Sequence, residues 1–249
     1  MSGHSKWSTI KHKKAALDAK RGKIFTRVIK ELTVSARVGG GDPDGNPRLR
    51  SAIAEAKAAN MPADNIKRAI MKGTGELPGV SYEDVVYEGY GPGGVAIYVE
   101  VLTDNKMRTT PEIRHVFTKH GGDLGQPNSV AWMFEKKGLF SIPAAAASEE
   151  QLMDIVLEAG ADDLQAADDN LEVTCASSAF SEVHDALEKA KIVPSQAKLA
   201  MVPTTVVELD AKKAGQCLKL LEVLEDHDDV QNVYANLSFD DDAVSEAAS

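Results

Sequence analysis

Basic side chains that could neutralise phosphate groups are concentrated at the start of the chain. Residues 1 to 38 contain ten Lys or Arg and two acidic residues, although the 249-residue chain has a formal net charge of -10. Up to Gly75 there are 16 basic and 6 acidic residues, or +10, which leaves 12 basic and 32 acidic residues, or -20, for the remainder. A basic segment of this kind most often faces a polyanion, and Lys and Arg contacts to phosphates dominate the affinity of nucleic-acid-binding proteins. We therefore expect the N-terminal part to bind nucleic acid.

The candidate nucleic-acid-binding residues are basic residues of this N-terminal part. They are Lys6, Lys11, Lys13, Lys14, Lys20, Arg21, Lys23, Arg27, Lys30, Arg37, Arg48 and Arg50. A possible second contact is formed by Lys106 and Arg108, which interrupt an otherwise acidic region. The alternative for these two is a helix-entry turn in which Asp104 or Asn105 caps the helix.

No residues have the spacing of a catalytic or metal centre. The Ser, Cys and His residues show no arrangement that indicates a nucleophile and its base. The stretch Gly89 to Gly94 contains G-x-G-x-x-G, but a β-rich run follows it, whereas dinucleotide binding requires a helix there. His115 and His120 are five positions apart and do not form the i, i+4 metal pair. We therefore expect a non-enzymatic protein without cofactor, metal or small-molecule substrate, in which both cysteines, Cys175 and Cys217, are free and buried.

The N-terminal part is expected to be a small helical domain. Apolar residues that share one face of a helix recur at three- and four-residue steps from position 25, while Lys23, Arg27, Lys30 and Arg37 lie opposite. Asn46 followed by Pro47 is typical of a helix start. A third helix, which opens at Pro62 and stops at Gly73, carries Lys67, Arg68 and Lys72 on its outward side.

From Tyr82 onward the pattern changes to alternating strands and helices. Four short β-α-β units can be counted, and such units pair into antiparallel sheets with helices on one side. We expect an α+β fold with an N-terminal helical domain and two ferredoxin-like α/β domains, one inserted in the other. The expected boundaries are 1–79 for the helical domain, 80–129 with 204–240 for the first α/β domain, 130–203 for the inserted domain and 241–249 for a disordered tail. Two strands, at 130–134 and 138–142, are expected to form a hairpin that turns at Lys136-Lys137.

No apolar run approaches the length of a membrane helix, and the basic N-terminus lacks the apolar core of a secretory signal. We expect a cytoplasmic protein with no membrane partner. The acidic cluster at 222–229 is expected to be a solvated surface.

Many short runs resemble the YebC/PmpR family along nearly the whole chain. The N-terminal ones are Gly3 to Trp7, His12 to Ala15, Lys20 to Thr26, Gly39 to Asp44, Asn46 to Arg50 and Asn60 to Pro62. The later ones are Tyr87 to Gly94, Asp104-Asn105 with Arg108-Thr109, and Gly121-Gly122 with Gly125. The second half of the chain is similar in layout more than in motif.

The resemblance implies a helical domain, two α/β domains and a non-enzymatic regulator of gene expression. Some members look like DNA-binding transcriptional regulators, and others look like ribosome-associated factors that assist elongation, notably through proline-rich stretches. The helix from Ile24 offers Lys and Arg with Glu31 and Thr33, which suits phosphate contacts better than base reading. We therefore favour RNA or the ribosome over duplex DNA, with a protein-interaction scaffold as a further alternative.

Overall fold

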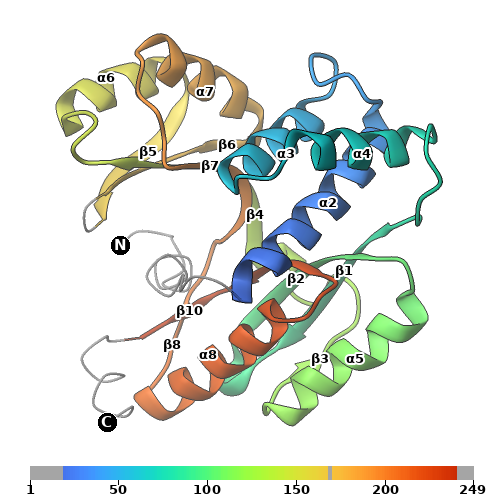
Figure 1. Cartoon of the computed structure of the whole chain (residues 1–249). Helices are drawn as coiled ribbons and strands as arrows, with labels where there is room; N and C mark the ends of the chain where they lie inside the picture. The colour runs from blue at the N-terminus through green and yellow to red at the C-terminus, as the bar shows by residue number, and fades with distance from the viewer. Residues whose placement is uncertain (1–18, 168–169, 240–249) are drawn as a thin grey trace. The chain divides into compact units, whose positions relative to one another are not determined.

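The computed structural model describes residues 19–167 and 170–239, including the side chains except those of 19–21 and 167. The chain divides into two compact units, one formed by Phe134–Thr205 and the other by the described residues before and after it. The predicted tail at 241–249 lies outside the described residues. Figure 1 traces the order of the elements along the chain.

Three helices form the helical domain of the larger unit: α2 (Ala19–Gly39), α3 (Pro47–Ala58) and α4 (Ala63–Thr74). Asn46 caps α3 by accepting a hydrogen bond from the Leu49 N–H, with Pro47 at the first helical position, as predicted. The buried apolar residues of the three helices make one core, which contains Val28, Leu32, Ala36, Leu49, Ala52, Ala56, Met61, Ile66 and Ala69.

Gly73 allows α4 to approach α2 closely. A Cβ at this position would lie 2.3 Å from the Thr33 carbonyl oxygen and 2.8 Å from the Ala36 Cβ. No side chain fits in that space, so glycine fixes the distance between the two helices.

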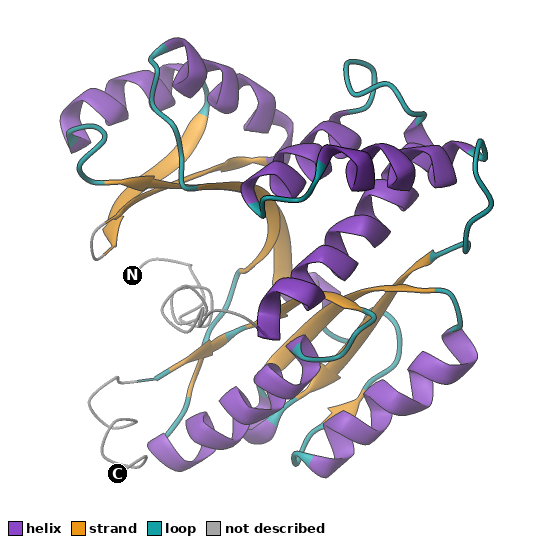
Figure 2. Ribbon diagram, in the orientation of Figure 1, coloured by secondary structure: helices purple, strands orange, loops and turns teal. Residues whose placement is uncertain are grey.

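The larger unit also contains a four-stranded antiparallel sheet in the order β3-β1-β2-β9. Its strands are β1 (Glu83–Tyr90), β2 (Ala96–Thr103), β3 (Asp123–Leu124) and β9 (Val230–Ala235). Helices α5 (Lys106–Lys119) and α8 (Ala211–Glu225) pack on the same face of this sheet (Figure 2). Phe117 of α5 and Leu220 of α8 are fully buried against strand residues such as Ile97. Short strands β8 (Val207–Glu208) and β10 (Leu237–Ser238) pair in parallel beside the sheet.

The unit Phe134–Thr205 has its own sheet, in the order β5-β6-β4-β7, and its own core. The strands are β4 (Phe134–Pro143), β5 (Ala161–Ala167), β6 (Asn170–Ala176) and β7 (Gln196–Pro203). Helices α6 (Glu149–Glu158) and α7 (Phe180–Lys189) supply buried Leu152, Val156, Val183 and Leu187 to that core. The α+β fold class, with N-terminal helices and antiparallel sheets, is therefore confirmed.

The predicted hairpin at 130–142 is wrong. Residues 131–133 form a 3-10 turn, and Phe134–Pro143 is one continuous strand that pairs with β6 on one side and β7 on the other. Lys136 pairs with Met201 of β7, and Lys137 pairs with Ala200 of β7 and Ala176 of β6, so both residues continue the strand and no turn forms there.

Candidate nucleic-acid interface

The structure does not describe the side chains of six of the predicted nucleic-acid-binding residues. Lys6, Lys11, Lys13 and Lys14 lie outside the described residues. Lys20 and Arg21 belong to the first turn of α2, but their side chains lie outside the description. The other six are described, and each has an internal hydrogen-bond acceptor.

Two cations of α2, Lys23 and Arg27, bind the C-terminal end of α8. Lys23 Nζ lies 3.1 Å from Asp226 Oδ1 and 3.0 Å from the Asp226 carbonyl oxygen. Arg27 donates to the Glu225 carbonyl oxygen. The last carbonyls of a helix lack partners within the helix and carry the negative end of its dipole, so basic side chains are favourable there. These cations therefore hold α2 against α8.

Lys30 is buried, with 6% of its surface exposed. Its ammonium group lies 2.7 Å from Asp229 Oδ1, 3.0 Å from the Asp228 carbonyl oxygen and 3.4 Å from the Leu102 carbonyl oxygen. An ammonium group has three N–H donors, and all three have acceptors here. The prediction that Lys30 lies with Lys23, Arg27 and Arg37 on an outward cationic face is thus wrong at Lys30, because its charge is used inside the protein.

Asp229 is the centre of this network and is 4% exposed. Its Oδ2 accepts hydrogen bonds from Arg108 at 2.7 Å, Thr109 at 2.7 Å and Thr103 at 3.1 Å, while Lys30 donates to Oδ1. Burial raises the pKa of Asp229, but the hydrogen bonds from Lys30, Thr109 and Arg108 outweigh it and hold the pKa well below its usual range. Asp229 is therefore ionised at neutral pH.

The acidic cluster at 222–229 is consequently only partly solvated, contrary to the prediction. Asp228 is exposed, whereas Asp229 is buried and Asp226 binds Lys23. The acids at the end of α8 and the cations of α2 neutralise each other, which a charge count along the sequence does not reveal.

An open hollow of about 660 Å³ lies beside this network. Acidic and basic side chains both line it, among them Asp104, Glu112, His115 and His227. His227 Nδ1 accepts from the Asp229 N–H at 3.2 Å, and its Nε2 lies 3.1 Å from Glu112 Oε2, so the ring bridges two elements. A lining of mixed charge favours no single class of charged ligand.

The remaining cations predicted in the helical domain also bond within the chain. Arg48 donates to the Glu31 carboxylate at 2.6 and 3.0 Å and to Asp84 at 2.9 Å, and the hydrogen bond that it donates to Glu31 raises the pKa of Arg48. Arg37 donates to Ser81 and to the Tyr82 carbonyl oxygen. Arg50 donates to two carbonyl oxygens, of Pro43 and Asp44, both at 3.2 Å.

The second predicted contact is a helix entry. Asn105 caps α5 by accepting from the Arg108 N–H, which matches the alternative given for this stretch. Arg108 is committed to Asp229 and Asp104, whereas Lys106 is exposed. Of this pair, only Lys106 has no ion pair within the part of the chain that the structure describes.

Four further cations of the helical domain were not among the predicted site residues. Lys57 on α3 and Lys67, Arg68 and Lys72 on α4 are exposed. Within the described residues, none of them forms a hydrogen bond or an ion pair. Helical periodicity already placed the α4 cations outward, but only the structure separates cations with internal acceptors from cations without them.

The glycine-rich stretch from Gly89 to Gly94 connects two strands, as predicted. β1 ends at Tyr90, a 3-10 turn spans Pro92–Gly94 and β2 begins at Ala96. A Cβ at Gly93, where φ is +80°, would lie 2.4 Å from Leu209 Cδ2. Glycine is thus required here for a tight packed turn, and no helix follows that could hold a pyrophosphate.

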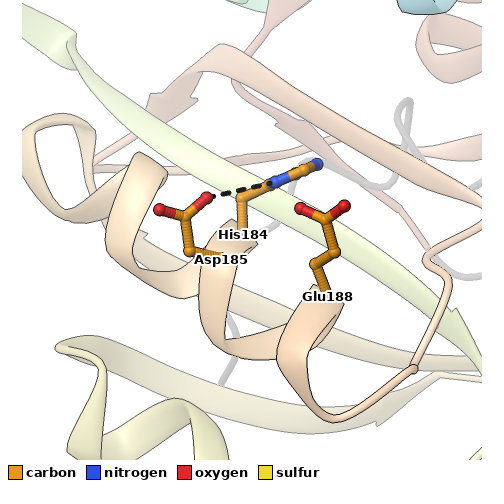
Figure 3. Close-up of side chains that lie close together, drawn as sticks. All are labelled: His184, Asp185 and Glu188. Atoms are coloured by element: carbon orange, nitrogen blue, oxygen red, sulfur yellow. Dashed lines mark ion pairs between the residues drawn. The ribbon is translucent and has the colours of Figure 1, made fainter.

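A cluster of three possible metal ligands lies on α7, formed by His184, Asp185 and Glu188 (Figure 3). All three are exposed, and His184 Nδ1 lies 3.9 Å from Asp185 Oδ1. The His184 ring is next to the rings of Phe180 and Phe140, with centroids 6.4 and 6.5 Å away. Metal-ligating histidines are usually oriented by a polar partner on the second ring nitrogen, and we assign no metal to this cluster.

The two cysteines are free and buried, as predicted. Burial raises the pKa of Cys217 to about 12, so its thiol is protonated at neutral pH. Neither is positioned as a reactive thiolate.

Two family models match adjacent parts of the chain. The model described as the TACO1/YebC protein N-terminal domain matches residues 5–76, and the model described as the TACO1/YebC second and third domain matches residues 82–237. The chain belongs to the TACO1/YebC family. The predicted resemblance to YebC proteins is therefore confirmed.

Relatives and a solved structure agree with this membership. A protein of Acidobacterium capsulatum is 61% identical over 248 residues, which cover 100% of both chains. One of Desulfosudis oleivorans is 56% identical over 247 residues, covering 99% of this chain and 100% of the relative. Both are named probable transcriptional regulatory protein. The crystal structure of a conserved hypothetical protein from Aquifex aeolicus, at 47% identity, superposes with a TM-score of 0.87 and covers 95% of this chain and 98% of that one.

Among the described helices of this TACO1/YebC protein, none is both long enough and apolar enough to cross a membrane.

Proposed function

We propose that this protein is a non-enzymatic regulator of gene expression that binds nucleic acid through its helical domain. It acts in translation as an RNA- or ribosome-associated factor, including elongation through proline-rich stretches. The +10 charge of the first 75 residues and the names of the relatives support a nucleic-acid partner.

The burial of α2 is the observation that favours RNA over duplex DNA. A helix that reads bases in the major groove must be exposed so that it can enter the groove. α2 is buried on its apolar side at Val28 and Leu32 and on its other side at Lys30 and Val34. It therefore cannot serve as a recognition helix while these contacts hold. Contacts made by cations on the outside of the domain suit a phosphate backbone, and structured RNA is recognised by shape and backbone.

The test is co-sedimentation of the full-length protein with purified bacterial ribosomes at moderate salt, with duplex DNA as competitor. We expect the protein to travel with ribosomes and duplex DNA to release little of it. A cell-free translation assay then compares a message that encodes a proline run with a matched message that lacks it. Added protein is expected to raise the yield of the first and leave the second unchanged.

The second candidate is a DNA-binding transcriptional regulator, which the names of the relatives favour. It predicts sequence-dependent binding to duplex DNA and no enrichment with ribosomes. That pair of results would contradict the translational role and support the transcriptional one.

A further inference from the structure

We infer that the outward side of α4 is the phosphate-contacting surface of this protein, with Lys67, Arg68 and Lys72 as its contacts. We call these three residues the α4 cations. This inference rests on the proposed function, because the outward side of α4 is the surface with which the helical domain would contact nucleic acid.

The α4 cations are accessible to a ligand. Ile66, Ala69 and Gly73 form the buried side of α4. At 100° per residue, Lys67, Arg68 and Lys72 fall on the other side, and all three are exposed. The same side carries one acidic residue, Asp64, which makes no ion pair with them. The surface is thus positively charged and open.

Ion pairs within the described residues do not explain these charges. Arg68 and Lys72 are like charges at i, i+4, an arrangement that disfavours a helix slightly. No acceptor among the described residues compensates it, in contrast to Lys23, Lys30 and Arg48, each of which pairs with a carboxylate. A bound phosphate backbone would supply the missing negative charge.

The helix that carries the α4 cations is held firmly against α2. Gly73 packs against the Thr33 carbonyl, and Thr33 Oγ1 donates to the Ala69 carbonyl oxygen at 3.3 Å. α4 ends at Gly75 in the left-handed conformation, with φ at +83°. Three cations on a helix fixed in this way can match a fixed spacing of phosphates without the entropy cost of ordering a loop.

The experiment measures binding of the full-length protein to a fluorescently labelled RNA hairpin over roughly 50 to 200 mM salt. The test variant is Lys67→Gln, Arg68→Gln and Lys72→Gln together. The control is Arg114→Gln, Lys119→Gln and Lys212→Gln, three exposed helical cations of the same unit that also form no ion pair within the described residues. The two variants change the net charge equally.

We expect the test variant to lower the slope of log affinity against log salt by roughly 2 to 3, since each phosphate contact contributes about 0.7 to 0.9. The control is expected to keep the wild-type slope, and both variants to keep the wild-type thermal unfolding temperature. A test variant that binds with the wild-type slope overturns the assignment of α4 but leaves nucleic-acid binding intact. A wild-type protein that binds neither the hairpin nor ribosomes overturns the proposed function itself, so the two failures are distinguishable.

Discussion

Helices α2 and α4 are neighbours in one domain and both carry a row of cations, but those cations have opposite surroundings. On α2, Lys30 is 6% exposed and Lys23 binds Asp226, so the charges join the helix to the acidic end of α8. On α4, Lys67 and Arg68 are exposed and have no acceptor among the described residues. A basic residue is available to a ligand only where the fold leaves its charge without an internal partner.

The buried ion pair between Lys30 of α2 and Asp229, with its hydrogen bonds, contributes to the stability of the fold. Removing a buried pair from water costs several kcal/mol per ion, and its hydrogen bonds offset much of that cost only while every partner is present. Removing one partner of the buried pair should therefore lower the free energy of unfolding far more than removing an exposed cation does. This asymmetry distinguishes the cations of α2 from those of α4.

The largest loss of stability is expected for Asp229→Ala. This change leaves the buried Lys30 ammonium and Thr109 hydroxyl without their carboxylate, so the free energy of unfolding should fall by about 3 to 5 kcal/mol. Urea denaturation followed by tryptophan fluorescence measures it. The control is Asp228→Ala, one residue away but exposed, for which a change within about 0.5 kcal/mol is expected. Equal losses in the two variants would show that the network does not stabilise the fold.

The next effect is expected for Gly73→Ala, which tests the attachment of α4 to α2. The added Cβ would lie 2.3 Å from the Thr33 carbonyl oxygen, so the helices must separate, at a cost of about 1 to 3 kcal/mol. Gly215→Ala on α8 is the control, because nothing lies within 4 Å of its Cβ position and alanine should stabilise that helix by roughly 0.5 to 1 kcal/mol. Thermal unfolding should shift in opposite directions for the two variants. A shift in the same direction would contradict the packing described for Gly73.

The pH dependence of stability tests the same network. The pKa of Asp229 is lowered in the folded state, so its contribution is fully present above the unfolded value of about 3.9 and is lost as the pH falls toward the folded value. Between pH 5 and pH 3, wild type should therefore lose more stability than Asp229→Asn, by at most about 1.4 kcal/mol per pH unit. Equal losses for both would mean that the carboxylate is not stabilised by folding.

The smallest effect is expected for Lys23→Gln. The Lys23 and Asp226 side chains are 42% and 59% exposed, and an exposed ion pair contributes less than about 1 kcal/mol. The unfolding temperature should change little and should approach that of wild type further in high salt. A loss as large as that of Asp229→Ala would place Lys23 in the buried network.

Much of the fold could be predicted from local patterns. The periodicity of Val28, Leu32 and Ala36 identified the buried side of α2, and Asn46-Pro47 identified the start of α3. The prediction failed where strand pairing between residues far apart in the sequence determines the secondary structure. β4 continues through Lys136 and Lys137 because β6 and β7 flank it, and neither strand is local to that sequence.

The candidate site was predicted less well than the fold, for a physical reason. The sequence shows which residues are basic, but acceptors such as Glu225 and Asp229 lie about 200 positions from Arg27 and Lys30. Charge patterning therefore ranked the α2 cations above the α4 cations, although only the latter are free of internal partners among the described residues. The α4 cations themselves were identified as outward-facing by periodicity alone.

The most direct test of the difference between α2 and α4 is the salt dependence of RNA binding in two matched double variants. Lys23→Gln with Arg27→Gln removes two cations of α2, and Arg68→Gln with Lys72→Gln removes two of α4. The account predicts that the α4 variant lowers the slope of log affinity against log salt by roughly 1.4 to 1.8, whereas the α2 variant keeps the wild-type slope. A lowered slope in the α2 variant with a wild-type slope in the α4 variant would contradict it.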